Sequence, residues 1–216
     1  MDNKVRNLQA IMDCGVVAIV RVGNTKDAVE VCKAVIKGGV KPVEVTMTTP
    51  GAIEAIMEFK DVAQDDTIVG AGTVLDPETA RTAILAGAEF IVSPTLNLGV
   101  IEVCHRYGKI VIPGAFSPTE ILAAWEAGAD IVKVFPAGVV GPQYIRDIMG
   151  PLPQIRLSPV GGVNLENTPH FIRAGAVAVS VGTSLVDQKA LSQKKYEIIT
   201  ENAERFIEAV RLARSG

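Results

Sequence analysis

The stretch Ala127-Gly128-Ala129-Asp130-Ile131-Val132-Lys133-Val134-Phe135-Pro136-Ala137 contains the unit from which this chain of 216 residues is built. Its Ala-Gly-Ala start is typical of a helix C-terminus, and the apolar run 131–135 predicts a buried β-strand. Similar runs recur along the chain, each followed by a polar or glycine-rich turn and then by a stretch with helical spacing. Eight strands are predicted, at residues 16–20, 43–47, 67–71, 90–93, 110–113, 131–135, 155–159 and 177–181.

Strands that alternate with helices predict an α/β fold with a parallel sheet. Eight such units over this length predict one closed (β/α)₈ (TIM) barrel, a single domain over residues 1–216. An open doubly wound sheet is the second choice, because it usually carries a glycine fingerprint after its first strand and residues 21–24 do not match one. In a barrel, the functional residues are expected at the C-terminal ends of the strands.

Composition excludes several classes of function. A net charge of −3 and 5% aromatic residues argue against binding of nucleic acid. Three widely spaced cysteines, Cys14, Cys32 and Cys104, predict neither disulfides nor a zinc site and fit a reducing cytoplasm. The sequence has no signal-peptide pattern and no apolar run near the roughly 18 residues that a membrane span needs. We therefore expect a soluble, cytoplasmic protein without membrane partners.

Lys133 is anomalous because it lies in an otherwise apolar strand. Burial disfavours the ammonium form, so such a lysine is either paired with an anion or lowered in pKa enough to attack a carbonyl as an amine. Strand alternation places Glu44 on the inward face of the second strand. The two residues could form a plain ion pair, or they could supply the nucleophile and the proton shuttle of imine (Schiff-base) catalysis.

Other candidate residues lie at predicted strand ends. The loops 159–164 and 181–185, after the seventh and eighth strands, are placed where barrels often bind phosphate, although ordinary tight turns would look similar. Arg21 and Thr73 could hold a substrate carboxylate, with a surface salt bridge and a helix cap as the simpler readings. Pro94 shapes the rim. Two histidines, His105 and His170, and no cluster of carboxylates predict no metal.

Six segments, in order over nearly the whole chain, resemble those of the 2-keto-3-deoxy-6-phosphogluconate (KDPG) / 4-hydroxy-2-oxoglutarate (KHG) aldolase family. They are 43–46 (Val-Glu-Val-Thr), 70–74 (Gly-Ala-Gly-Thr-Val), 91–94 (Ile-Val-Ser-Pro), 131–137 (Ile-Val-Lys-Val-Phe-Pro-Ala), 150–153 (Gly-Pro-Leu-Pro) and 161–163 (Gly-Gly-Val). The resemblance implies a class I aldolase that cleaves KDPG to pyruvate and glyceraldehyde 3-phosphate, and KHG to pyruvate and glyoxylate. It further implies no cofactor, a homotrimer and a place in Entner–Doudoroff carbohydrate metabolism.

The resemblance also assigns roles to individual residues. Lys133 would form the Schiff base and Glu44 would be the general acid/base. The remaining positions would contact substrate: Thr73 at its carboxylate, Phe135 beside the imine, Pro94 at the rim, and Gly161, Gly162 and Ser184 at its phosphate. Thr48 is also a candidate substrate contact, at a position where some family members have an arginine, and we hypothesise that Arg21 replaces that arginine.

Two other functions use some of the same residues. A sugar-phosphate isomerase or epimerase would need the phosphate loops and Glu44 but would form no adduct at Lys133. A non-catalytic barrel that binds a phosphorylated metabolite would need only the loops and would leave an interior lysine and glutamate without a purpose.

Overall fold

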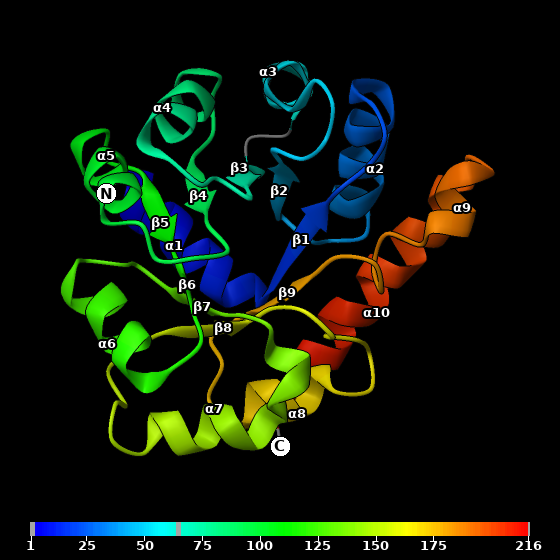
Figure 1. The fold of residues 1–216 in the computed structure, drawn as a ribbon. Coiled ribbons are helices and arrows are strands. Elements are labelled where there is room, and N and C mark those ends of the chain that lie inside the picture. Colours follow the sequence, from blue (N-terminus) through cyan, green and yellow to red (C-terminus); the bar gives the residue numbers. More distant parts are fainter. Residues whose placement is uncertain (1–2, 64–65, 216) are drawn as a thin grey trace.

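The computed structural model describes residues 3–63 and 66–215, in which helices surround parallel strands (Figure 1). The elements follow one another in strand–helix alternation, after an N-terminal helix. They are α1 (Asn3–Cys14), β1 (Val16–Val20), α2 (Thr25–Lys37), β2 (Pro42–Thr46), α3 (Ala52–Val62), β3 (Ile68–Gly72), α4 (Pro77–Leu85), β4 (Phe90–Val92), α5 (Leu98–Arg106), β5 (Ile110–Ile112), β6 (Gly114–Ala115), α6 (Pro118–Glu126), β7 (Val132–Val134), the 3₁₀ helix η1 (Ala137–Val139), α7 (Gly141–Met149), β8 (Leu157–Pro159), α8 (Thr168–Arg173), β9 (Val179–Val181), α9 (Gln188–Ser192) and α10 (Tyr196–Ser215).

The prediction of one closed (β/α)₈ barrel is wrong. The described strands form two parallel sheets, one of six strands in the order β5-β4-β3-β2-β1-β9 and one of three in the order β6-β7-β8. The predicted fifth strand is divided at Pro113, which has no N–H group to donate to a ladder. Between β8 and β9, the described residues form a single isolated bridge, Val160 to Ser180. The fold is α/β with parallel strands, and the six-stranded sheet is an open half-barrel that faces the smaller sheet.

Helix boundaries follow from capping residues in the sequence. The side chains of Asp76 and Asn97 accept hydrogen bonds from the first turns of α4 and α5, and Ser117 forms a complete capping box with Glu120 at the start of α6. The helices that end in Ala-Gly-Ala stop where the glycine takes a positive φ, as Gly128 does at 96°. These caps place each strand directly after the preceding helix.

The apolar core has an outer and an inner part. The outer part lies between the strands and the helices. The inner part joins Ile11 of α1 to side chains of the large sheet and to Ile131, which directly precedes β7 of the small sheet, and α1 crosses behind the strands in Figure 1. The inner part contains Ile11, Val17, Ile68, Phe90, Val92, Ile110, Ile112 and Ile131. It forms an apolar floor beneath the C-terminal ends of the strands. No described helix is both long and apolar enough to cross a membrane.

Candidate active site

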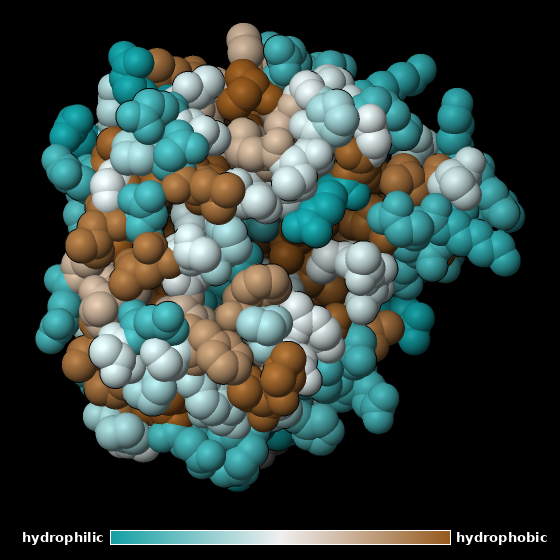
Figure 2. All heavy atoms as spheres, in the orientation of Figure 1, coloured by the Kyte–Doolittle hydropathy of each residue, from teal (hydrophilic) through white to brown (hydrophobic). Residues whose placement is uncertain are grey.

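A cavity of about 440 Å³ opens between the two sheets, at the C-terminal ends of the strands. The face into which it opens is hollowed near its middle, with apolar atoms inside and polar atoms at the edge (Figure 2). Of the predicted site residues, all but Thr48 line this cavity: Arg21, Glu44, Thr73, Pro94, Lys133, Phe135, Gly161, Gly162 and Ser184. Residues in, or directly after, seven of the eight predicted strands are therefore brought together.

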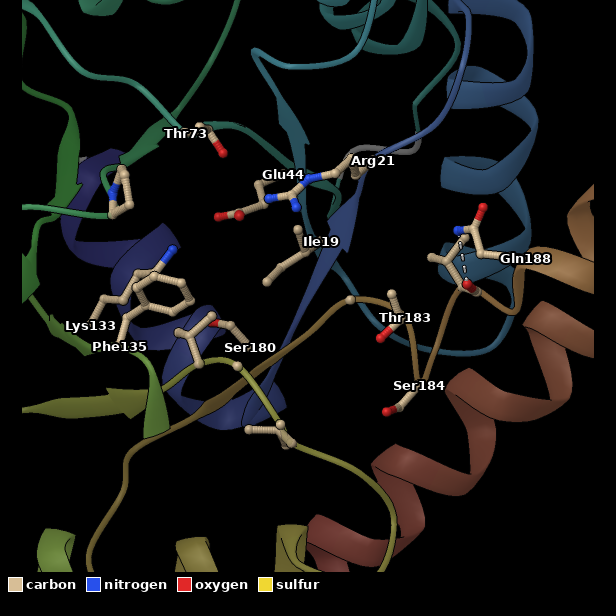
Figure 3. Close-up of a pocket in the computed structure, with 17 residues that line it drawn as sticks. Ile19, Arg21, Glu44, Thr73, Lys133, Phe135, Ser180, Thr183, Ser184 and Gln188 are labelled. Carbon is tan, nitrogen blue, oxygen red and sulfur yellow. Dashed lines mark hydrogen bonds between the residues drawn. The ribbon is translucent and has the colours of Figure 1, made fainter. Parts of the chain in front are cut away.

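Glu44 and Lys133 face each other across this cavity. Glu44 comes from β2 of the large sheet and is 1% exposed, and Lys133 comes from β7 of the small sheet and is 6% exposed. Their side chains point toward one another in Figure 3. The Glu44 carboxylate packs against Gly72, where a Cβ would lie 2.5 Å from Oε1, and Oε2 has no hydrogen-bond partner in the described structure. One oxygen of the carboxylate is therefore buried without a partner among the described residues, which disfavours its charged form.

Burial shifts the pKa values of both residues toward neutrality. Desolvation raises the pKa of Glu44 to about 7, although the positive charges of Lys133 and Arg21 oppose the shift. Desolvation also lowers the pKa of Lys133, with Arg21 acting in the same direction and Glu44 against it. A proton can therefore be exchanged near pH 7, and part of the lysine can exist as the free amine, which is the nucleophilic form.

Phe135 directly follows β7 and lies beside Lys133. The Lys133 Nζ is 5.0 Å from the centroid of the Phe135 ring, within the range of a cation–π contact. The Phe135 ring is also close to the loop after β8, because a Cβ added at Gly161 would lie only 3.2 Å from the ring. The aromatic ring thus connects the lysine to the loop that follows β8.

The loop after β8 lines the cavity with two glycines, Gly161 and Gly162. Gly161 and Gly162 have φ angles of 86° and 75°, in the region that favours glycine. Gly161 accepts a hydrogen bond from the amide of Gly138 through its carbonyl and directly follows the Val160–Ser180 bridge, whereas the amide of Gly162 donates to no group among the described residues. Together with the exposed hydroxyls of Thr183 and Ser184 after β9, the Gly162 amide provides neutral donors suited to an anion.

Arg21, Thr73 and Thr48 differ in position. Arg21 is exposed at the end of β1 and lines the cavity, and Thr73 lines it with a φ of 58°, an unusual conformation for a β-branched residue. Such outliers concentrate at functional sites. Thr48 is exposed outside the cavity lining, with its hydroxyl 3.0 Å from that of Thr46. The structure therefore gives Arg21, and not Thr48, access to a molecule in the cavity.

Val160, Val163, Gly182 and Thr183 line the cavity as parts of the two predicted loops, and four lining residues were missed by the reading of the sequence: Ile19, Ser180, Val186 and Gln188. Ser180 had a signal, since it is a polar residue within a predicted apolar strand. Gln188 had none, because it reaches the cavity only through the fold of the segment after β9. Among the described residues, no group of three His, Cys, Asp or Glu side chains lies close enough to hold a metal.

Known proteins match this chain over almost its whole length. The model of the KDPG and KHG aldolase family matches residues 8–202. A 2-dehydro-3-deoxy-phosphogluconate aldolase of Treponema pallidum is 33% identical, over 94% of this chain and 96% of the relative. A 2-dehydro-3-deoxy-6-phosphogalactonate aldolase of Escherichia coli is 34% identical, over 91% of this chain and 95% of the relative.

A solved structure is also similar. It is the KDPG aldolase of Legionella pneumophila with pyruvate captured as a covalent carbinolamine intermediate, with a TM-score of 0.85 and 27% identity over 92% of this chain and 96% of that one. These matches support an aldolase over an isomerase, an epimerase or a non-catalytic binding protein. The chain belongs to the KDPG and KHG aldolase family and is an aldolase, a carbon–carbon lyase.

Proposed function

We propose that this protein is a class I aldolase that cleaves a 2-keto-3-deoxy sugar acid phosphate such as KDPG, with Lys133 as the Schiff-base residue and Glu44 as the general acid/base. The observation that carries the proposal is the buried pair itself. Glu44 and Lys133 lie on opposite sides of one cavity, and burial shifts their pKa values toward each other. An ion pair kept only for stability would hold the two charges in direct contact, whereas Oε2 of Glu44 has no partner.

The first half of the reaction forms the imine. Lys133 adds as a free amine to the C2 ketone of the substrate and gives a carbinolamine. Glu44, through a water molecule, protonates the C2 hydroxyl so that it leaves as water. The product is a protonated imine, in which the positive charge stays on the nitrogen of Lys133.

The second half breaks the carbon–carbon bond. Glu44, now a carboxylate, removes the C4 hydroxyl proton, and the electrons of the C3–C4 bond move to the protonated imine to give an enamine. The aldehyde, glyceraldehyde 3-phosphate for KDPG, leaves with C4 as its carbonyl carbon. Protonation of the enamine at C3 and hydrolysis of the imine then release pyruvate and restore Lys133.

The rest of the cavity matches the ends of such a substrate. Arg21 and Thr73 are the groups we assign to the substrate carboxylate, as a cation and a hydroxyl donor. Phe135 and Pro94 flank the reacting carbons. The amides of Gly161 and Gly162 and the hydroxyl of Ser184 are assigned to the phosphate.

The substrate is tested by comparing kcat/KM for KDPG, for its galactonate epimer and for KHG. All three contain the pyruvoyl half that Lys133 needs, and they differ in the aldehyde half. We expect the phosphorylated aldols to be preferred because of the amide-lined loop. A preference for KHG would contradict the assignment of that loop to phosphate.

We further propose that the chain is a single domain that works as a homotrimer in the cytoplasm. Its cysteines, Cys14, Cys32 and Cys104, are free, which suits a reducing compartment. Exposed apolar side chains, among them Leu98 and Val139, support contact between subunits. Cleavage of KDPG would place the enzyme in the Entner–Doudoroff route.

A further inference from the structure

Two buried serines next to the catalytic pair have no role in the mechanism above. Ser158 of β8 is 1% exposed and Ser180 of β9 is 6% exposed. Ser158 is paired in register with Lys133, and Ser180 with Val17 of the inner core, so both hydroxyls lie on the inward face. Their oxygens are 3.2 Å apart.

The hydrogen bond between the two serines uses only one of their two hydroxyl protons. Each serine hydroxyl has one donor and can accept as well, so one hydroxyl donates within the pair and the proton of the other needs a different acceptor. Neither hydroxyl has another partner in the described structure.

The surroundings decide which proton is left over. Ser180 lines the cavity and Ser158 does not. If Ser180 donated to Ser158, the proton of Ser158 would be buried without an acceptor, which is costly. Ser158 therefore donates to Ser180, and the hydroxyl of Ser180 directs its proton into the cavity.

The position of Ser180 determines which atoms of the substrate lie next to its hydroxyl. β9 leads from Ser180 to the rim residues Gly182 and Ser184, while Ser158 connects it to the strand of Lys133. In Figure 3, Ser180 lies between Lys133 and Phe135 on one side and Thr183 and Ser184 on the other. A substrate that is bound to Lys133 through C2 and has its far end at the rim places the atoms next to the C3–C4 bond beside Ser180.

We propose that the hydroxyl of Ser180, oriented by Ser158, donates a hydrogen bond to the C4 oxygen of the aldol, an inference that rests on the proposed function. This oxygen loses its proton toward Glu44 while the C3–C4 bond breaks, and a lone pair remains to accept from Ser180. The donor stabilises the negative charge that develops on the oxygen before the carbonyl is complete. In the reverse reaction the same donor polarises the aldehyde.

The test separates the two halves of the reaction. S180A should lower kcat/KM about 10-fold for cleavage of both KDPG and KHG, the scale of one hydrogen bond, because both substrates have an oxygen at C4. The exchange of pyruvate methyl protons with deuterated water, followed by NMR, should be unchanged because it involves only Lys133 and Glu44. S158A removes the orienting partner and should lower cleavage by a smaller factor, about 2-fold.

T67V is the matched control, since Thr67 also carries a buried hydroxyl, one that has no hydrogen-bond partner among the described residues, but it precedes β3 at the opposite end of the strands. It should leave both reactions unchanged. The role of Ser180 would be overturned if S180A cleaved both substrates at the wild-type rate. It would also be overturned if S180A lost proton exchange in parallel with cleavage, or lost cleavage of KDPG alone. If the wild-type protein itself exchanged no pyruvate protons, the proposed function would fall together with this inference, which distinguishes the two failures.

Discussion

At the scale of single residues, burial acts on Glu44 and Lys133 in opposite directions. A carboxyl group and an amine in water have pKa values about six units apart. In the cavity, desolvation raises the pKa of Glu44 to about 7 and lowers that of Lys133, so the acid and the base approach each other. Near neutral pH, Glu44 is therefore populated both as the acid and as the carboxylate. A residue that accepts a proton and later returns it needs both forms.

The pH dependence of kcat/KM should report this shift. Glu44 accepts a proton only as the carboxylate, so activity should fall as the pH drops below about 7. E44Q should lower kcat by about 10²–10⁴-fold and abolish this acid limb. E54Q, at an exposed glutamate of α3, is the control and should keep both. Near-normal kcat in E44Q would remove Glu44 from the chemistry.

Arg21 is the second residue-scale prediction. Loss of its charge from the cavity rim in R21A should raise KM for pyruvate-containing substrates about 10- to 100-fold, the scale of a charge-assisted hydrogen bond. T48A should change KM little, because Thr48 lies outside the cavity lining. An unchanged KM in R21A would refute the assignment of the carboxylate to this arginine.

At the scale of elements, the loop after β8 depends on its glycines. Gly162 has a φ of 75°, and a Cβ there would lie 2.9 Å from the Cα of Gly138. An alanine must therefore strain the backbone and displace η1 or the loop itself. The backbone amides next to the cavity would then move.

G162A should consequently lower kcat/KM for KDPG roughly 10-fold more than for unphosphorylated KHG. G108A tests strain alone, because Gly108 also has a positive φ, 62°, but a Cβ there meets nothing within 4 Å. It should leave the ratio of the two substrates unchanged. An equal loss for both substrates in G162A would argue against a phosphate role for the loop.

The sequence predicted the elements better than their pairing. Apolar runs and capping residues placed the strands and helices, since these signals are local. The division at Pro113 and the single bridge between Val160 and Ser180 depend on hydrogen bonds between distant segments, which periodicity does not encode. The site was largely predicted because strand ends of parallel units meet, whereas Gln188 begins the short helix α9, which reaches the cavity through a connection after β9 that carries no periodic pattern.

At the scale of the whole molecule, the cavity rests on the inner apolar core. Ile11 of α1 is fully buried and packs with side chains of the large sheet and with Ile131, which directly precedes β7, so it connects two halves that share little backbone pairing. I11A should lower the free energy of unfolding by about 2–5 kcal/mol, measured with urea. V5A, at an exposed position of the same helix, should be nearly neutral. Equal stability of I11A and V5A would contradict a structural role for α1.

The whole account depends on a covalent bond at one side chain. Pyruvate and borohydride should be added to the wild-type protein, to E44Q and to K133R, and the site of any mass increase located by peptide mapping. We predict an adduct of one reduced pyruvate at Lys133 in the wild type, slower trapping in E44Q, and none in K133R. No adduct in the wild type, or an adduct at another lysine, would contradict the proposed mechanism.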